Sequence, residues 1–415
     1  MDTARIYPRS ERRLVLEALA DTRVVMLLGA RQVGKSTLAR QIVEDEHVAQ
    51  VVDLDRPAPR QAALTDPVGF VAGLERPVLI DEVQRGGPEL LLAIKSVVDR
   101  DLSPGQFLLT GSANLLRSPR TLDALTGRVD IVTLWPLAQA EIEETRTNFV
   151  DALLSERPPR ITDAPAGRDA LRDRISTGGY PEARLRSGRS RSRWFESYLR
   201  TTLERDLESV ADVYKLQEVP RLLRLLAAQT ANLFVPANLG NRLSLDHRTV
   251  DRYASLLELT YLVKRIPAWR PGLGQREVQH PKAHVVDSGL LLHLLGGDEE
   301  RLLTDDQLTG KALESFVAME IVKHAEWADE QARIHHYRRG SEQIDLVLEN
   351  RAGDIGAVEV KSSASLSARD WQPLARLRDA YGSRFRCGFL VHAGADTVPL
   401  GDRLYAVPLS GLWAA

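Results

Sequence analysis

The chain has 415 residues, of which 43% are hydrophobic and 27% charged. Its formal net charge of −2 at pH 7 excludes a uniformly basic surface for binding nucleic acid, but it does not exclude local basic patches. This length predicts two or three domains, and the single cysteine, Cys387, excludes a disulfide framework and a multi-cysteine zinc site. Since the sequence shows neither an apolar signal region nor a run of about 20 apolar residues, we expect a cytoplasmic protein without a membrane partner.

An apolar strand, a glycine-bounded turn and an amphipathic helix are predicted in succession over residues 23–43. The turn reads G-x-x-x-x-G-K-S, the spacing in which backbone N–H groups and a helix N-terminus surround phosphate groups. Lys35 is expected to reach the β- and γ-phosphates of ATP, and Ser36 to bind Mg²⁺. The residues expected to contact ATP are Gly29, Ala30, Arg31, Gln32, Val33, Gly34, Lys35, Ser36 and Thr37.

Two further apolar strands are predicted to end beside this turn, because the carboxyl ends of parallel strands meet at one edge of a sheet. The first leads into Asp81, which suits the outer shell of Mg²⁺, and into Glu82, which is placed to polarise the attacking water. The second leads into Thr110 and Ser112. Their hydroxyls are either contacts of the nucleotide or ordinary turn caps.

Arg128 follows in the segment GRVDIVTLWPL at 127–137. An arginine at the carboxyl edge of the sheet can stabilise transition-state charge, either in its own subunit or on a neighbouring one. We expect Arg128 at that edge as a catalytic residue, and an ordinary surface arginine is the alternative.

Together these motifs resemble bacterial AAA-type ATPases whose C-terminal half is a domain of unknown function. The later segments GGYPE (178–182) and KAHVVDSGLL (282–291) resemble that half, so the resemblance covers nearly the whole chain. It implies an AAA-like domain that uses ATP and Mg²⁺, with Thr110 or Ser112 as the sensor of the γ-phosphate, and it leaves a homo-oligomer open.

An arginine-rich run at 184–205 contains seven arginines and two glutamates, with Trp194, Phe195 and Tyr198 among them. Basic and aromatic residues together favour contact with nucleic acid. The i, i+4 spacing of the aromatic residues instead favours a buried helical face, with the arginines solvated or paired.

Residues 220–266 are predicted to form three helices followed by an apolar strand. Within them, the segment 233–266 shows the spacing of a helix-turn-helix with its turn at Leu243 to Leu245, and this resembles a winged helix. Asp246 is predicted to cap the second helix, whose outer side carries His247, Arg248 and Arg252. Such a module binds DNA in some ATPases and serves as a lid or subunit contact in others.

The last part of the chain places Asp345 on one predicted strand, and Glu359 and Lys361 on the next. An amphipathic helix before them carries Glu314. This D…E-x-K arrangement is typical of restriction-endonuclease-like folds, in which Asp345 and Glu359 would bind Mg²⁺ and Lys361 would orient the water. A cross-strand ion pair on an exposed sheet face is the alternative explanation.

We therefore expect an α/β protein with an AAA-like P-loop NTPase domain at 1–150, a helical and winged-helix region at 165–295, and an endonuclease-like α/β domain at 305–415. The predicted function is Mg²⁺-dependent ATP hydrolysis coupled to DNA binding or remodelling, with nuclease activity as a further expectation. DNA would contact the winged helix, the 184–205 run or the C-terminal domain. The rival prediction is a nucleotide-controlled switch that binds a protein partner and has an inactive nuclease-like fold. The predicted catalytic residues are Lys35, Glu82, Arg128, Asp345, Glu359 and Lys361.

Overall fold

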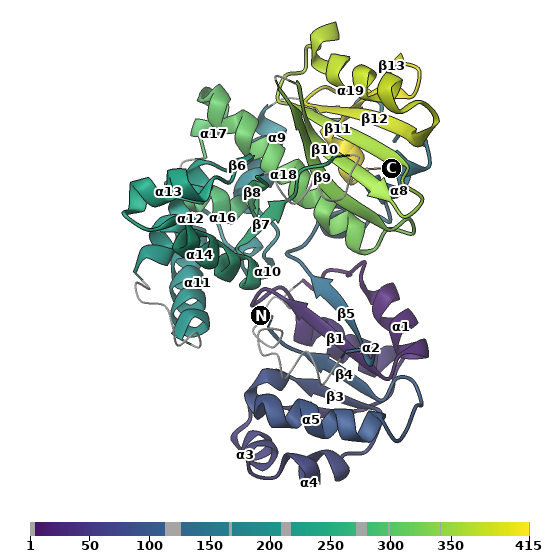
Figure 1. Ribbon diagram of the computed structural model, residues 1–415, viewed down its shortest axis with the longest axis vertical. Helices are drawn as coiled ribbons and strands as arrows, with labels where there is room; N and C mark the ends of the chain where they lie inside the picture. Colours follow the sequence, from purple (N-terminus) through teal and green to yellow (C-terminus); the bar gives the residue numbers. More distant parts are fainter. Residues whose placement is uncertain are drawn as a thin grey trace. The chain divides into compact units, whose positions relative to one another are not determined.

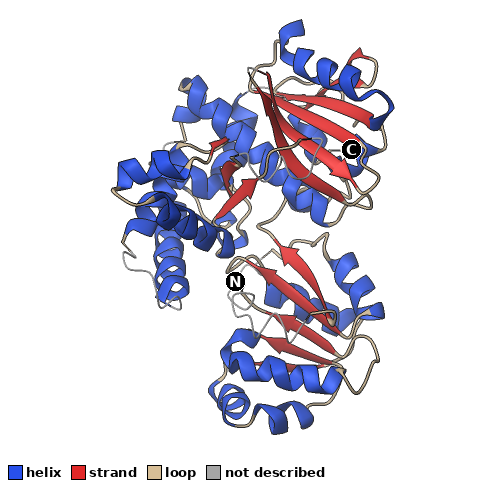
Figure 2. Ribbon diagram, in the orientation of Figure 1, coloured by secondary structure: helices blue, strands red, loops and turns tan. Residues whose placement is uncertain are grey.

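The computed structural model describes residues 5–112, 126–165, 168–208, 217–270, 280–297, 299–340 and 342–414. The chain divides into two compact units. The P-loop unit comprises residues 9–135 and 259–261, and the C-terminal unit comprises residues 1–8, 136–258 and 262–415. Figures 1 and 2 show the helices and strands of both units. No helix within the described ranges is long and apolar enough to cross a membrane.

The described part of the P-loop unit forms a five-stranded parallel sheet in the order β2-β3-β4-β1-β5. β1, β3 and β4 are buried along their whole length, which explains their continuous apolar sequences. The strands are β1 (Val24–Gly29), β2 (Gln50–Asp53), β3 (Val78–Asp81), β4 (Phe107–Thr110) and β5 (Val129–Leu134).

Helices cover both faces of this sheet (Figure 1). α1 and α2 pack on one face, while α3, α4 and α5 pack on the other around a core that includes Met26, Ile80 and Leu109. Because the strands run in the same direction, Gly29, Asp81 and Thr110 lie at the same carboxyl edge. The helices are α1 (Arg12–Asp21), α2 (Lys35–Asp45), α3 (Pro57–Thr65), α4 (Pro67–Ala72) and α5 (Gly87–Val98), with the 3-10 turn η1 (Val83–Gly86) before α5.

In the C-terminal unit, the middle of the chain forms a small antiparallel sheet in the order β6-β8-β7. α12 packs against β8 and α13. The elements follow one another as helix, strand, helix, helix, strand and strand. They are α12 (Glu218–Ala228), β6 (Asn232–Leu233), α13 (Pro236–Leu243), α14 (His247–Leu259), β7 (Val263–Ile266) and β8 (Lys282–Val285).

The end of the chain forms a larger mixed sheet in the order β13-β14-β12-β11-β10-β9. Its strands are among those drawn in red in Figure 2. α19 (Ala368–Tyr381) packs on one face, and α8 and α18 contact strands of the same sheet. The pairing of β9 with β10 shifts register between Ile344 and Val347, a bulge that lies at Asp345. The strands are β9 (Ala332–Arg339), β10 (Glu342–Asn350), β11 (Ile355–Lys361), β12 (Phe385–His392), β13 (Val398–Gly401) and β14 (Leu404–Pro408).

α18 (Asp306–Glu326) connects the two sheets of the C-terminal unit, because it contacts β8 of the small sheet and both β10 and β11 of the large one. Its residues from Ser315 to His324 are buried on every side, as expected for a helix enclosed within a core. The remaining helices of this unit are α7 (Gln139–Ile142), α8 (Phe149–Leu154), α9 (Arg168–Thr177), α10 (Pro181–Arg184), α11 (Gly188–Glu208), α16 (Ser288–Leu294) and α17 (Arg301–Thr304), with the 3-10 turns η3 (Gly382–Arg384) and η4 (Leu409–Leu412).

Candidate functional site

The turn between β1 and α2 has the backbone geometry of a phosphate-binding loop. A Cβ atom at Gly29 would lie 2.1 Å from the carbonyl oxygen of Leu134, so only glycine fits where β1 passes the end of β5. Gly34 has a φ of +101° at the start of α2, a conformation that L side chains rarely adopt. These two glycines allow the loop to close over the N-terminus of α2, where anions bind.

Lys35 is folded onto the backbone of its own loop. Its ammonium donates hydrogen bonds to the carbonyl oxygens of Gly29, at 3.1 Å, and Ala30, at 2.7 Å. The side chain is buried, with an exposed fraction of 6%. The cation expected to contact the phosphates is therefore held within the loop expected to surround them.

Asp81, at the end of β3, lies at the centre of a hydrogen-bond network. The hydroxyl of Ser36 donates to its Oδ1 at 2.7 Å, and the hydroxyl of Thr110 donates to the same oxygen. Asp81 is buried, and Arg40 Nη2 lies 3.3 Å from its Oδ2. A hydroxyl and a carboxylate in contact are a donor pair that suits Mg²⁺, so the predicted pair of Ser36 and Asp81 fits a magnesium-bound nucleotide.

Glu82 adopts a left-handed backbone conformation, with a φ of +55°. Its N–H donates to the hydroxyl of Thr110 at 3.1 Å, and its carboxylate accepts a hydrogen bond from the side-chain amide of Gln84. Non-glycine residues rarely adopt this left-handed backbone conformation. Those that do are frequent at functional sites. Gln84, which sequence reasoning did not single out, therefore holds the carboxylate expected to polarise the water.

The predicted sensor residues are close to these carboxylates. Thr110 is fully buried, and its hydroxyl is shared between Asp81 and the N–H of Glu82. Ser112 lies two residues beyond the end of β4 and is half-buried. The contact of either hydroxyl with a γ-phosphate stays a prediction.

Two residues that no motif includes also lie at this edge. Arg40 Nη2 is 3.6 Å from Oδ2 of Asp53, in addition to its contact with Asp81. Asp53 ends β2 and lies opposite Asp81 in the parallel register. The sequence signal for Asp53 was present, because Asp53 ends an apolar strand in the same way as Asp81.

Arg9 is a buried arginine that contacts the P-loop from outside the motif. Its Nη1 donates to the carbonyl oxygen of Val33 at 2.7 Å, and its Nη2 donates to the carbonyl oxygen of Trp135 at 2.8 Å. Glu11, which is fully buried, lies 3.6 Å away. Sequence reasoning missed Arg9 because nothing local relates it to residues 33 and 135.

The expected position of Arg128 is wrong. β5 begins at Val129, which pairs in parallel with Val24, the first residue of β1. Arg128 therefore lies at the amino edge of the sheet, about 16 Å along β1 from the P-loop at five rises of about 3.3 Å each. There it pairs with Asp99 and donates to the carbonyl oxygen of Thr126 at 2.8 Å, so it cannot act on a nucleotide bound by its own subunit.

The three residues of the D…E-x-K pattern lie together in the C-terminal unit, joined by a lysine that the pattern does not include. Lys282, at the start of β8, donates to Oε1 of Glu314 at 2.5 Å and to Oδ1 of Asp345 at 3.1 Å. Oδ2 of Asp345 accepts from the N–H of Val360 at 3.0 Å. Lys361 donates to Oε1 of Glu359 at 2.9 Å. We call Lys282, Glu314, Asp345, Glu359 and Lys361 the carboxylate cluster.

Burial and mutual repulsion raise the pKa of two members of this cluster. Burial raises the pKa of Glu314 to about 8 and that of Glu359 to about 8, and the nearby Asp345 carboxylate adds to both shifts. Burial lowers the pKa of Lys282, but Asp345 and Glu314 outweigh it, so the pKa lies above its usual value. The same balance, with Glu359 as the main partner, raises the pKa of Lys361.

The cluster is not the exposed ion pair considered as the alternative. Asp345 is 7% exposed and Glu359 is 4% exposed, and Glu359 Oε2 has no hydrogen-bond partner within the described residues. No three His, Cys, Asp or Glu side chains of the described ranges are grouped to hold a metal ion. The cations within the carboxylate cluster are the ammonium groups of Lys282 and Lys361. The binding of Mg²⁺ by Asp345 and Glu359 stays a prediction.

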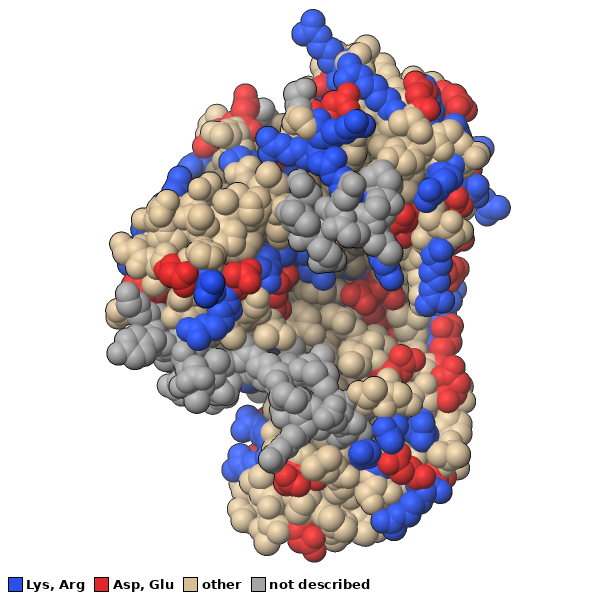
Figure 3. All heavy atoms as spheres, in the orientation of Figure 1, with Lys and Arg blue, Asp and Glu red and all other residues tan. Residues whose placement is uncertain are grey.

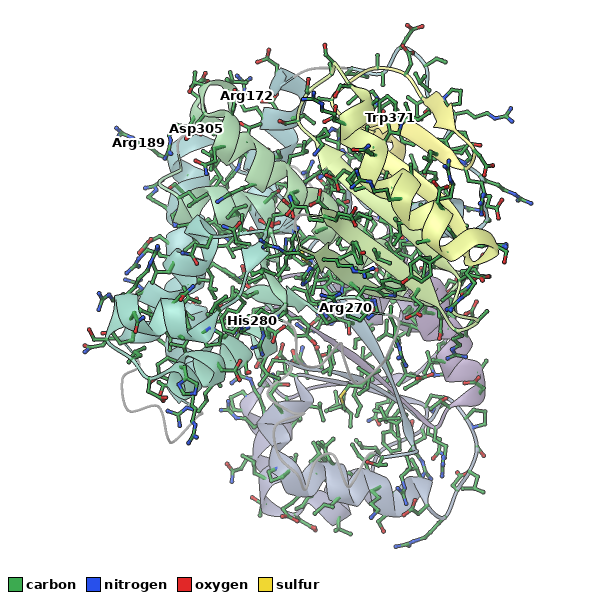
Figure 4. The ribbon with its side chains drawn as sticks, turned by 45° about the horizontal axis from the view of Figure 1, so that its top comes forward. Arg172, Arg189, Arg270, His280, Asp305 and Trp371 are labelled. Atoms are coloured by element: carbon green, nitrogen blue, oxygen red, sulfur yellow. The ribbon has the colours of Figure 1, made fainter. Side chains whose placement is uncertain are left out.

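The aromatic residues of the arginine-rich run are packed inside the C-terminal unit. Trp194 stacks on Tyr198 with 5.1 Å between ring centroids, and both rings contact the fully buried Tyr180. This confirms the buried-face interpretation for the aromatic residues. Arg191 pairs with Glu299 at 3.3 Å, whereas Arg189 projects from the start of α11 (Figure 4). Arg193 and Arg200 of the run are also exposed.

α14 exposes basic residues on its outer side, with Asp251 exposed among them. The predicted cap is confirmed, because the carboxylate of Asp246 accepts from the N–H groups of Arg248, at 3.2 Å, and Thr249, at 3.1 Å. His247, Arg248 and Arg252 are exposed, as predicted.

Figure 3 shows basic and acidic side chains interspersed on the face in view, which agrees with the small net charge.

Family models match the chain in three places. Residues 21–143 match the AAA domain, residues 168–301 match a domain of unknown function (DUF8612), and residues 309–412 match another domain of unknown function (DUF4143). The P-loop unit therefore carries an AAA-type ATPase domain, which confirms the predicted P-loop α/β fold. The winged-helix and endonuclease-like identities of the other regions stay predictions.

The chain is similar over most of its length to the uncharacterized proteins Mb2031c of Mycobacterium bovis and Rv2008c of Mycobacterium tuberculosis. Identity to each is 29% over 393 residues, or 94% of this chain and 81% of the relative. The Thermotoga maritima RuvB Holliday junction branch migration motor matches at 19% identity over 62% of this chain and 88% of its own, with a TM-score of 0.28. A STAND protein with a tetratricopeptide repeat sensor from Pyrococcus horikoshii matches at 13% identity over 75% of this chain and 49% of its own, with a TM-score of 0.26.

Proposed function

We propose that this protein binds ATP with Mg²⁺ at the P-loop, hydrolyses it, and couples hydrolysis to contact with DNA. The observation that carries the first part is the 2.7 Å hydrogen bond between Ser36 Oγ and Asp81 Oδ1, beside the buried Lys35. It brings together, from α2 and β3, the hydroxyl that would bind a nucleotide-bound magnesium ion and the carboxylate that would lie in the outer shell of that ion. When bound, Mg²⁺ neutralises phosphate charge.

The residues around this pair have separable roles. Lys35 would exchange its carbonyl partners for the β- and γ-phosphates. Glu82 would orient and polarise the attacking water, for which its carboxylate must leave the amide of Gln84. Thr110 would fix the positions of Asp81 and Glu82 relative to each other, because its hydroxyl contacts both residues.

Contact with DNA is supported by the order of elements from α12 to β8, which is that of a winged helix. In such modules the second helix of the helix-turn-helix enters the major groove. α14 would take this place, with its exposed His247, Arg248 and Arg252 as the side chains that contact phosphates and base edges.

The test is steady-state ATP hydrolysis with and without single-stranded, duplex and branched DNA. Wild-type protein should hydrolyse ATP, DNA should raise the rate, and Arg248→Ala with Arg252→Ala should reduce the stimulation while leaving the basal rate unchanged. Arg351→Ala, which removes an exposed arginine from the turn between β10 and β11, is the control. Hydrolysis that no DNA stimulates would contradict the coupling, and a chain that hydrolyses no ATP would contradict the whole proposal.

The rival function, a nucleotide-controlled switch for a protein partner, is favoured by one observation. Lys282 donates to Oδ1 of Asp345, so the carboxylate cluster already contains its own cation. A nuclease-like site in this state is a structural core rather than a catalytic centre. Magnesium- or manganese-dependent cleavage of DNA that is lost in Glu359→Ala would exclude this rival and support nuclease activity.

A further inference from the structure

Arg9 holds the P-loop by a contact that the motif does not include. The two terminal nitrogens of its guanidinium donate to different carbonyl oxygens, that of Val33 at 2.7 Å and that of Trp135 at 2.8 Å. Arg9 is 9% exposed. Hydrogen bonds from a charged donor shielded from water are stronger than neutral ones, so this contact is well suited to fix the backbone that it touches.

The carbonyl group of Val33 belongs to the same peptide unit as the N–H of Gly34. In a planar trans peptide the C=O and N–H bonds point in opposite directions. Because the C=O bond points at Arg9, the N–H bond of Gly34 points to the other side of the loop. The backbone N–H groups of this loop are the donors that surround phosphates in the G-x-x-x-x-G-K-S arrangement.

This peptide needs an external hold because the glycine on one side of it resists rotation only weakly. Gly34 has a φ of +101°, and a glycine accepts positive and negative φ about equally. A rotated Val33–Gly34 peptide would direct a carbonyl oxygen, instead of an N–H, toward an anionic ligand. A guanidinium fixed on the carbonyl side opposes that rotation.

We propose that Arg9 is a positioning residue of the nucleotide site, which keeps the Val33–Gly34 peptide in the orientation that binds phosphate. Its second hydrogen bond, to Trp135, anchors the guanidinium to the chain just beyond β5, whose last residue already meets Gly29. Arg9 thereby supports both ends of the loop. This inference rests on the proposed binding of ATP.

The test compares Arg9→Met, Arg9→Gln and Arg9→Lys with wild type, using calorimetric titration of ATP and steady-state kinetics. Arg9→Met should weaken ATP binding and raise KM by about tenfold or more, with kcat within about threefold, because one charged hydrogen bond behind the loop is lost. Arg9→Lys should recover part of the affinity, since an ammonium can still donate to Val33, and Arg9→Gln should lie between Lys and Met. Arg13→Met is the matched control, because Arg13 is an exposed arginine of α1 that pairs with Glu17.

Several outcomes would overturn the inference. ATP affinity of Arg9→Met within about twofold of wild type would do so, as would a fall in kcat at constant KM. If Arg9→Met fails to fold, as shown by its melting curve without nucleotide, unchanged affinity in both Arg9→Lys and Arg9→Gln would overturn it instead. Failure of the proposed function looks different, because wild-type protein itself would then bind no ATP.

Discussion

The nucleotide site and the carboxylate cluster use the same residue types in opposite ways. At the nucleotide site Lys35 donates to backbone carbonyl oxygens, while the carboxylate of Asp81 accepts from the hydroxyls of Ser36 and Thr110. In the cluster Lys282 donates directly to the carboxylates of Glu314 and Asp345. A lysine held by weak dipoles can move to an anionic ligand at little cost, whereas a lysine held by buried carboxylates cannot. The arrangement at the nucleotide site therefore suits the binding of a ligand, and the arrangement in the cluster suits a fixed structural contact.

The largest effect is expected from Lys35→Ala. This change should reduce ATP hydrolysis by on the order of 10³-fold, because the β- and γ-phosphates lose their cation. The melting temperature of the protein without nucleotide should change little, since the lysine partners are loop carbonyls. Hydrolysis at the wild-type rate would show that the P-loop is not the site.

The two carboxylates at the end of β3 should separate binding from chemistry. Glu82→Gln should still bind ATP but hydrolyse it on the order of 10²-fold more slowly, because the water loses its base. Asp81→Ala should instead weaken the Mg²⁺ dependence of ATP binding. Titration of ATP with and without Mg²⁺, followed by single-turnover hydrolysis, measures both, and identical behaviour of the two variants would remove these roles.

In the carboxylate cluster, Lys282→Ala should lower the free energy of unfolding by about 3–5 kcal/mol, because its removal leaves the buried carboxylate of Asp345 without its cation. Urea unfolding measures the change. Lys311→Ala, one turn before Glu314 on α18, is the control and should change stability little. A Lys282→Ala variant as stable as this control would mean that the cluster is solvated in the native protein.

The raised pKa values predict how stability depends on pH. Glu314 and Glu359 keep a proton up to about pH 8 in the folded state, whereas the unfolded chain releases it near pH 4.5. Between these values the unfolded state binds fewer protons, so stability from these groups is present in full below about pH 4.5 and is lost as pH rises toward 8. The slope is at most about 1.4 kcal/mol per pH unit and group. Glu359→Gln should flatten it, and an unchanged pH profile in that variant would contradict the assignment.

The smallest effect is expected from Arg128→Ala. Because Arg128 lies at the amino edge of the sheet, hydrolysis of ATP by dilute protein should stay within about twofold of wild type. The rate should be measured over a range of protein concentrations. A deficit that appears only at high concentration, where subunits associate, would show that Arg128 acts on a neighbouring subunit.

Much of the nucleotide site could be predicted from sequence, because its parts are local motifs whose relative positions the parallel sheet dictates. The cap by Asp246 was predictable for the same reason, since its partners lie two and three residues away. The position of Arg128 was predicted wrongly because the sequence around it does not indicate whether Arg128 precedes or follows β5.

Contacts between distant segments could not be predicted in this way. Lys282 and Asp345 are 63 residues apart, and Arg9 and Trp135 are 126 residues apart. One lysine in an apolar strand and one arginine before a helix carry no local signal of such partners. The D…E-x-K spacing indicated that carboxylates would converge, but it could not indicate which cation accompanies them.

The division of the chain has a consequence for how the protein is made. Residues 1–8 belong to the same unit as residues 136–258, so the P-loop unit is inserted within the sequence of the other. Arg9 and Trp135, the first and last residues of the inserted segment, are joined by a hydrogen bond of 2.8 Å. An inserted segment whose ends meet adds little to the entropic cost of folding its host, and the segment 9–135 can fold on the ribosome before residues 259–261 of the same unit have emerged. The host, by contrast, pairs residues 1–8 with segments that are made only after the whole insertion.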